Sequence, residues 1–180
     1  KYTAPKMGND SDAVDQCAVR LLDIFSHAVE GLTNERGGIF RAGTGSVMYY
    51  IWHANEMGAT PDGREANVPL PANYAPSLNV QLNGPVSLIK SFTKPDLSRV
   101  INGGPLTIEF TDTVFRSDES IEKVAQLVRM FVQLGGHQLQ LNTVNRDQLL
   151  DAQQHPEQYR NLIVRVWGWS GYFVELDKCY

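Results

Sequence analysis

The sequence lacks several features that define whole classes of protein. It has only two cysteines in 180 residues, too few for a disulfide-stapled secreted scaffold, so we expect a reduced protein. It has no run of about 18 apolar residues that could span a membrane. Its 16 basic residues are scattered and outnumbered by 20 acidic ones, which excludes nucleic acid as a main partner. The four histidines have no ligands at metal-binding spacing, so we predict no metal site.

What the sequence does contain is typical of a folded domain. Hydrophobic residues make up 42% of the chain and charged residues 20%, and 180 residues suffice for a core. There is no initiator methionine and no signal peptide. We therefore expect a cytoplasmic protein, and we interpret Lys1–Tyr180 as one segment of a longer polypeptide, truncated at both ends.

The spacing of apolar residues predicts alternating helices and strands. Helices are expected over residues 12–32, 85–92, 96–101, 117–134 and 145–153, the last with Asn145 and Gln148 as a capping box. Strands are expected over residues 46–52, 105–110, 139–144 and 162–166. This order indicates an α/β fold with right-handed crossovers.

Two side chains outside the strongest motif have competing interpretations. Cys17 falls on the apolar face of the helix 12–32, where we expect a packed core thiol rather than a catalytic one. Arg64 lies in the proline-rich loop 58–77, where we expect a surface salt bridge. The alternative for Arg64 is a bound carboxylate, because a guanidinium pairs bidentately with that group.

The most unusual stretch is Arg165–Tyr172, in which Gly168 stands between Trp167 and Trp169 directly after an apolar run. One interpretation is a tight turn that needs a positive φ at Gly168. The other is chemical: a glycine α-carbon has no side chain, so it can flatten without steric penalty into a radical delocalised over both flanking amides.

The run Asn161–Ser170 (NLIVRVWGWS), followed by Tyr172–Leu176, resembles the glycyl-radical loop of the glycyl radical enzymes, the pyruvate formate-lyase superfamily. Further motifs stand in the family's order and spacing: Gly58–Arg64 (GATPDGR), Pro69–Leu70, Asn83–Pro85 and Leu149–Tyr159 (LLDAQQHPEQY). The resemblance covers essentially the whole chain.

Trp167 departs from most of that family, which carries a small residue before the radical glycine, and Trp169 stands where tyrosine is more usual. The Trp-Gly-Trp version resembles the fumarate-adding branch, that is the alpha subunit of benzylsuccinate synthase and its alkylsuccinate and arylmethylsuccinate relatives. The resemblance then implies addition of a hydrocarbon, either a toluene-like alkylarene or an alkane, to fumarate.

The resemblance also implies the architecture and the partners. The segment 1–180 would be the C-terminal half of a ten-stranded α/β barrel and the glycyl-radical domain of a larger catalytic subunit in an anaerobic cell. The chain would bind no cofactor itself, because a separate activating enzyme with S-adenosylmethionine and an iron–sulfur cluster installs the radical on Gly168. The family's thiyl-forming cysteine lies upstream, so the isolated segment is expected to be inactive; small accessory subunits are further candidate partners.

Within this picture the resemblance assigns roles to individual residues. Arg165, Trp167, Trp169 and Ser170 would pack the glycine loop. The strand 46–52 would border the substrate cavity, lined either by Met48 and Tyr50 or by Val47 and Tyr49, and its apolar character favours a hydrocarbon substrate.

Two alternatives stay open. The first is a glycyl radical eliminase, dehydratase or decarboxylase, whose chemistry needs acid or base groups near the cavity. The second is a non-catalytic replacement radical domain that complements a damaged enzyme.

Overall fold

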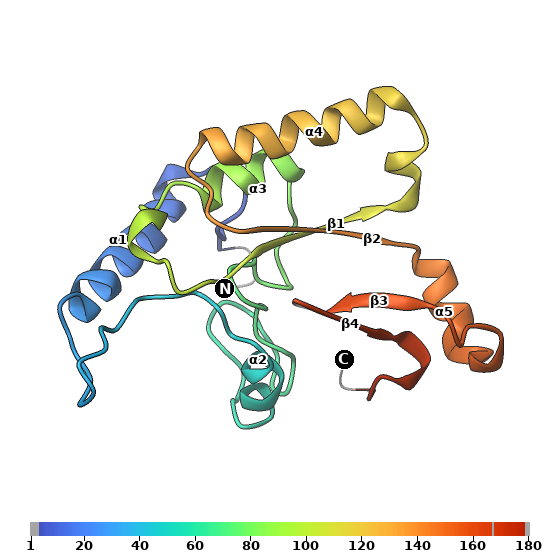
Figure 1. Cartoon of the computed structure of the whole chain (residues 1–180), viewed down its shortest axis with the longest axis horizontal. Coiled ribbons are helices and arrows are strands. Elements are labelled where there is room, and N and C mark those ends of the chain that lie inside the picture. The colour runs from blue at the N-terminus through green and yellow to red at the C-terminus, as the bar shows by residue number, and fades with distance from the viewer. Residues whose placement is uncertain (1–3, 167, 179–180) are drawn as a thin grey trace. The chain divides into compact units, whose positions relative to one another are not determined.

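The computed structural model describes residues 4–166 and 168–178, and its elements can be followed along the chain in Figure 1. The helices are α1 (Asp12–Val29), α2 (Tyr49–Trp52), α3 (Pro85–Phe92), α4 (Asp118–Gln133) and α5 (Arg146–Gln154). The strands are β1 (Leu106–Thr111), β2 (Leu139–Val144), β3 (Ile163–Val166) and β4 (Trp169–Tyr172). The chain divides into unit 1, Lys1–Thr107 with Glu122–Gln140, and unit 2, Ile108–Ile121 with Leu141–Tyr180.

The core of unit 1 is built largely on α3 and the segment that follows it. The sequence predicted α3 correctly: Gly84 adopts φ 106°, and Pro85 then opens the helix where its missing N–H costs nothing. Ile89, Val100 and Leu106 are almost completely buried, and Leu127 and Phe131 of α4 are also in the core. The predicted helix 96–101 is only a short 3-10 helix, Leu97–Arg99.

Helix α1 is confirmed, but its apolar face is not buried in this chain. The helix ends at Val29, because Glu30 is extended and Gly31 adopts φ 79°. Leu21, Ile24 and Phe25 remain 70, 57 and 43% exposed. Cys17 is exposed as well, so the prediction of a core thiol is wrong for this chain. The periodicity identified the helix correctly, but the described residues cover the predicted face only in part: Val14, Leu22 and Val29 are half-buried.

The strand predicted over residues 46–52 is wrong, because this segment forms α2 followed by the 3-10 helix His53–Asn55. Tyr50, Ile51 and Ala54 are all buried. Two consecutive buried residues with a third three positions later fit one face of a helix, whereas a strand turns consecutive side chains to opposite faces. A short run of aromatic and β-branched residues did not distinguish the two.

The remaining elements confirm the predicted alternation of helix and strand. β1 and β2 form a two-stranded sheet, and along β1 Leu106 and Ile108 are buried while Glu109 is exposed. In unit 2 the side chain of Asn145 accepts the Gln148 N–H at 3.1 Å, the predicted cap of α5. Among the described residues, no helix has both the length and the apolar character needed to cross a membrane.

Candidate functional site

The Gly168 stretch is the connection of a two-stranded antiparallel hairpin in unit 2 (Figure 1). Val166 of β3 pairs with Trp169 of β4, so only residues 167 and 168 connect the strands. Connections of two residues require positive φ, and Gly168 has φ 92°. The turn interpretation of Gly168 is therefore confirmed, and it is compatible with the radical interpretation, because one glycine can serve both purposes.

Gly168 is exposed and uncrowded in this chain. Its two chain neighbours aside, a Cβ placed on Gly168 would meet no heavy atom of the described residues within 4 Å. Sterically, then, the backbone φ alone demands glycine at this position. Its α-carbon is also accessible, as a reagent that acts on the backbone would require.

The residues predicted to pack the loop lie on the two strands beside the glycine. Arg165 and Ser170 are directly opposite one another, and Arg165 Nη1 donates to Ser170 Oγ at 3.3 Å. The Trp169 ring covers Gly171, where a Cβ would lie 2.8 Å from Trp169 Cζ3. Trp167 lies outside the described residues.

The hairpin is fastened at its base. The Phe173 N–H donates to the Leu162 carbonyl at 2.8 Å, and the Leu162 N–H donates to the Tyr159 carbonyl at 2.9 Å. The Tyr159 hydroxyl in turn donates to Asp151 of α5, and this hydrogen bond raises the pKa of the phenol. The motif that ends in Tyr159 therefore connects the hairpin to α5. The sequence did not predict this contact between Tyr159 and Asp151, which are eight residues apart.

A hollow of about 640 Å³ lies beside Tyr159 in unit 2. Its lining is polar and includes three aspartates and no basic residue: Asp112, Thr143, Asn145, Asp147, Gln148, Asp151 and Tyr159. Across residues 4–166 and 168–178, no three His, Cys, Asp or Glu side chains are placed to hold a metal ion. Two of the three aspartates already have partners. Arg116 forms an ion pair with Asp112, and the Tyr159 hydroxyl donates to Asp151.

The four predicted pocket residues do not share one face. Tyr50 is 8% exposed and belongs to the core, whereas Val47 and Tyr49 are 61 and 54% exposed. Met48 is half-buried and precedes the first turn of α2. The strand parity on which the choice between the two predicted pairs depended does not apply to a helix, so the assignment of these four residues to a substrate pocket stays a prediction.

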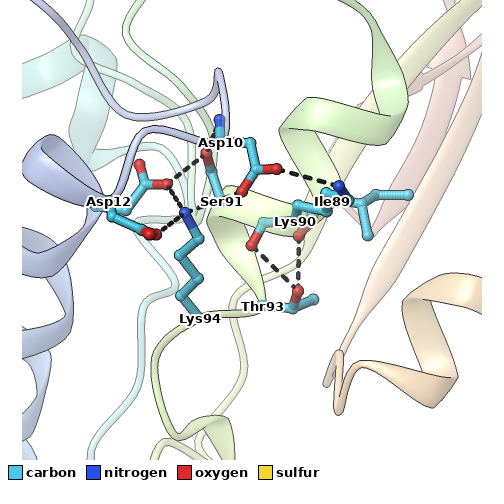
Figure 2. A network of polar contacts seen from close by, with 8 residues as sticks. Asp10, Asp12, Ile89, Lys90, Ser91, Thr93 and Lys94 are labelled. Atoms are coloured by element: carbon cyan, nitrogen blue, oxygen red, sulfur yellow. Dashed lines mark hydrogen bonds and ion pairs between the residues drawn. The ribbon is translucent and has the colours of Figure 1, made fainter.

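Figure 2 shows a polar cluster in unit 1 that sequence reasoning missed. Lys94 Nζ forms ion pairs with Asp10 Oδ1 at 3.0 Å, Asp12 Oδ1 at 2.7 Å and Asp15 Oδ2 at 2.7 Å. Ser91 Oγ donates to Asp15 Oδ2 at 2.9 Å and accepts the Asp10 N–H at 2.8 Å. Roughly eighty residues separate the two halves of the cluster, and no local pattern connects them.

A serine beside a lysine suggests nucleophilic catalysis, but the charges argue against it here. Burial lowers the pKa of Lys94, yet its hydrogen bonds to Asp12, Asp15 and Asp10 outweigh burial and raise the pKa above its ordinary value. An ammonium held protonated in this way cannot accept a proton from Ser91. The cluster instead fastens the start of α1 to the end of α3.

Arg64 differs from expectation in another way. Its side chain is buried, at 6% exposure, and it forms no ion pair with any described residue. Three backbone carbonyls surround the guanidinium instead, those of Gly58, Glu65 and Val68. The prediction of a surface salt bridge is therefore wrong.

Comparison with known proteins finds a family match that includes the hairpin. A protein family described as Glycine radical matches residues 70–174, a range that contains β3, Gly168 and β4. Trans-4-hydroxy-L-proline dehydratase of Clostridioides difficile is 33% identical over 175 residues, which cover 97% of this chain and 22% of that protein. Indoleacetate decarboxylase of Tractidigestivibacter scatoligenes is 34% identical over 175 residues, 97% of this chain and 20% of that protein.

A solved structure shows that the likeness extends to three dimensions. The glycerol-bound form of the B12-independent glycerol dehydratase from Clostridium butyricum matches with a TM-score of 0.93 and 34% identity, covering 99% of this chain and 23% of that one. The mixed α/β class is thereby confirmed, and the ten-stranded barrel stays a prediction. The chain spans about a fifth of the length of these relatives.

Proposed function

The chain is a glycyl radical domain of the pyruvate formate-lyase superfamily, and from that premise we propose that Gly168 stores the radical. The hairpin is the observation that carries this proposal. It places Gly168 at an exposed two-residue connection, inside the range that matches the family, with φ 92° and open space around the α-carbon. Loss of one hydrogen atom from that α-carbon leaves a radical that the two flanking amides delocalise.

The activation partner is part of the proposal. An activating enzyme that uses S-adenosylmethionine and an iron–sulfur cluster would abstract the Gly168 hydrogen atom. Gly168 would later regain a hydrogen atom from a cysteine thiol in the remainder of the catalytic subunit, and the resulting thiyl would act on substrate. This chain contributes the hairpin that holds the radical carbon and the polar contacts, Arg165 to Ser170 and Tyr159 to Asp151, that position it.

For the reaction class we propose elimination or decarboxylation rather than fumarate addition. The relatives compared above are named as two dehydratases and a decarboxylase, so they favour the first alternative drawn from the sequence. The benzylsuccinate synthase assignment finds no support among them. It depended in part on an apolar strand beside the cavity, but Tyr50 and Ile51 of that segment pack into the core. Their apolar character is therefore explained by packing and does not indicate a hydrocarbon substrate.

The test is an anaerobic electron paramagnetic resonance spectrum of the full-length protein produced together with its activating enzyme. We expect a doublet that collapses when the protein is labelled with α-deuterated glycine, and no signal from a Gly168→Ala variant. An unchanged doublet in Gly168→Ala would contradict the assignment of Gly168.

The same active protein tests the reaction class. We expect turnover of a diol, a hydroxyproline or an arylacetate in the absence of fumarate. Consumption of fumarate that depends on an added alkylarene or alkane would instead restore the fumarate-adding assignment.

A further inference from the structure

Arg64 is a buried cation whose donors are only partly used. Nη1 donates to the carbonyls of Val68 at 2.6 Å and Glu65 at 3.1 Å, and Nη2 donates to the Gly58 carbonyl at 2.6 Å. A guanidinium has five N–H donors, so three are engaged. The two that remain are Nε–H, which is buried without an acceptor among the described residues, and the second hydrogen of Nη2.

The two donors belong to nitrogens that are both bonded to the same guanidinium carbon. Nε and Nη2 share one edge of the planar guanidinium, and such an edge matches the two oxygens of a carboxylate. A buried donor without an acceptor costs free energy, and a buried charge without a counter-charge costs more. The three carbonyls reduce the second cost and leave the first in place. The Nε–Nη2 edge, in which Nε–H has no acceptor and Nη2 donates only to Gly58, therefore has the donors and the charge to hold an anion.

The acidic side chains around Arg64 do not fill this edge. The carboxylate of Asp62 accepts the Thr60 hydroxyl at 2.5 Å and the Ser77 hydroxyl at 3.4 Å. Glu65 is exposed and contacts the guanidinium through its backbone carbonyl. No described carboxylate lies within ion-pair distance of Arg64. Buried arginines usually have a carboxylate partner.

A pocket of about 320 Å³ in unit 1 is lined by Arg64. Val68, Pro69 and Leu78 give it an apolar wall, and Ser77 and Asn79 stand at its polar side. We propose that Arg64 and this pocket bind a carboxylate group, with the Nε–Nη2 edge donating to its two oxygens. Nε is covered in this chain, so binding requires the residues that cover it to shift.

Two sources can supply such a carboxylate: an Asp or Glu side chain of the polypeptide outside these 180 residues, or a free organic acid. A crystal structure of the full-length, unactivated protein separates them. The crystals are grown without carboxylate buffers, and a second set is soaked in 4-bromobenzoate, whose ring fits the apolar wall and whose bromine is located by anomalous scattering.

An acidic side chain on the Nε–Nη2 edge in unsoaked crystals supports the proposal with the polypeptide as the source. A bromine peak in the pocket, with the carboxylate on that edge, supports it with a free acid as the source. Water or a further backbone carbonyl on the edge, together with no bromine peak, overturns it. Because the protein is unactivated, none of these outcomes depends on the radical assignment of Gly168.

Matched variants extend the test to solution. If a free acid is bound, Arg64→Lys should weaken the calorimetric affinity for 4-bromobenzoate about tenfold or more, since lysine keeps the charge but loses the planar fork. Glu65→Gln should leave the affinity unchanged or increase it, because it removes a like charge from the rim. Equal affinity of the wild-type and Arg64→Lys proteins would show that the guanidinium edge does not hold the ligand.

Discussion

At the scale of single residues, the hairpin contains two glycines that are required for different reasons. Gly168 has open space but a φ of 92°, whereas a Cβ on Gly171 would lie 2.8 Å from Trp169 Cζ3 and 3.1 Å from Leu176 Cδ2. The first is a conformational demand and the second a packing demand. The proposed radical adds a third requirement, a glycine α-carbon at residue 168. An alanine at Gly171 does not affect this requirement.

This difference makes a paired prediction. Gly168→Ala should destabilise the full-length protein by about 1–2 kcal/mol, the cost of a left-handed residue with a side chain, and should abolish cleavage of the activated backbone by air. Gly171→Ala should cost about 1–3 kcal/mol through overpacking and keep that cleavage. Thermal unfolding and mass spectrometry of air-exposed protein measure both. Cleavage at residue 168 in neither protein, or in both, would be inconsistent with Gly168 as the radical site.

At the scale of elements, the attachment of α1 to α3 depends on Lys94. Asp15 is fully buried, and Lys94 is its cationic partner in the cluster of Figure 2. Lys94→Met leaves a buried carboxylate without its counter-charge, so we expect a loss of about 3–5 kcal/mol. Lys90 is half exposed and, within the described part of the chain, forms an ion pair only with Asp10, so Lys90→Met should cost about 0–1 kcal/mol. Similar melting temperatures for the two variants would contradict this account.

The same cluster gives the α1–α3 attachment a pH dependence. Hydrogen bonds from Lys94 and Lys90 lower the pKa of Asp10 below its ordinary value of 3.8, so this stabilisation is present above that pH and is lost as the pH falls further. The raised pKa of Lys94 adds stability that is complete below its ordinary value of 10.5 and is lost at higher pH. The protection factors of the α1 amides, measured by hydrogen exchange across the pH range, should therefore be level between these limits. A loss of protection in α1 near neutral pH would contradict this account.

Sequence patterns predicted the elements better than they predicted the site. β2 and α3 have the predicted bounds, and the Asn145 cap was predicted from one side chain and its spacing to Gln148. These are local effects that a few neighbouring residues decide. The Lys94 cluster depends on contacts between segments about eighty residues apart, so no local pattern encodes it. The carbonyls around Arg64 belong to residues 58, 65 and 68, but they meet the guanidinium only through the backbone path of an irregular loop, which side-chain patterns do not specify. The segment 46–52 failed because its β-branched and aromatic residues suit a buried helix turn as well as a strand.

At the scale of the whole molecule, the length of the relatives gives meaning to the exposed face of α1. The relatives named above are about five times longer than this chain. Nearly all of this chain aligns with them, but it covers only about a fifth of each relative. An amphipathic helix whose apolar residues face water costs free energy, so we expect the remainder of the polypeptide to cover Leu21, Ile24 and Phe25.

Truncation of one of these side chains tests that expectation. Leu21 is 70% exposed here, and Leu21→Ala would be almost neutral if it stayed so. If the remainder of the polypeptide buries Leu21, the same change creates a cavity and should lower the stability of the full-length protein by about 2–5 kcal/mol. Arg20→Ala, at the adjacent exposed position on α1, is the matched control and should be close to neutral. Thermal unfolding of the three full-length proteins decides: a Leu21→Ala protein as stable as the control would mean that this face of α1 remains in water in the full-length protein.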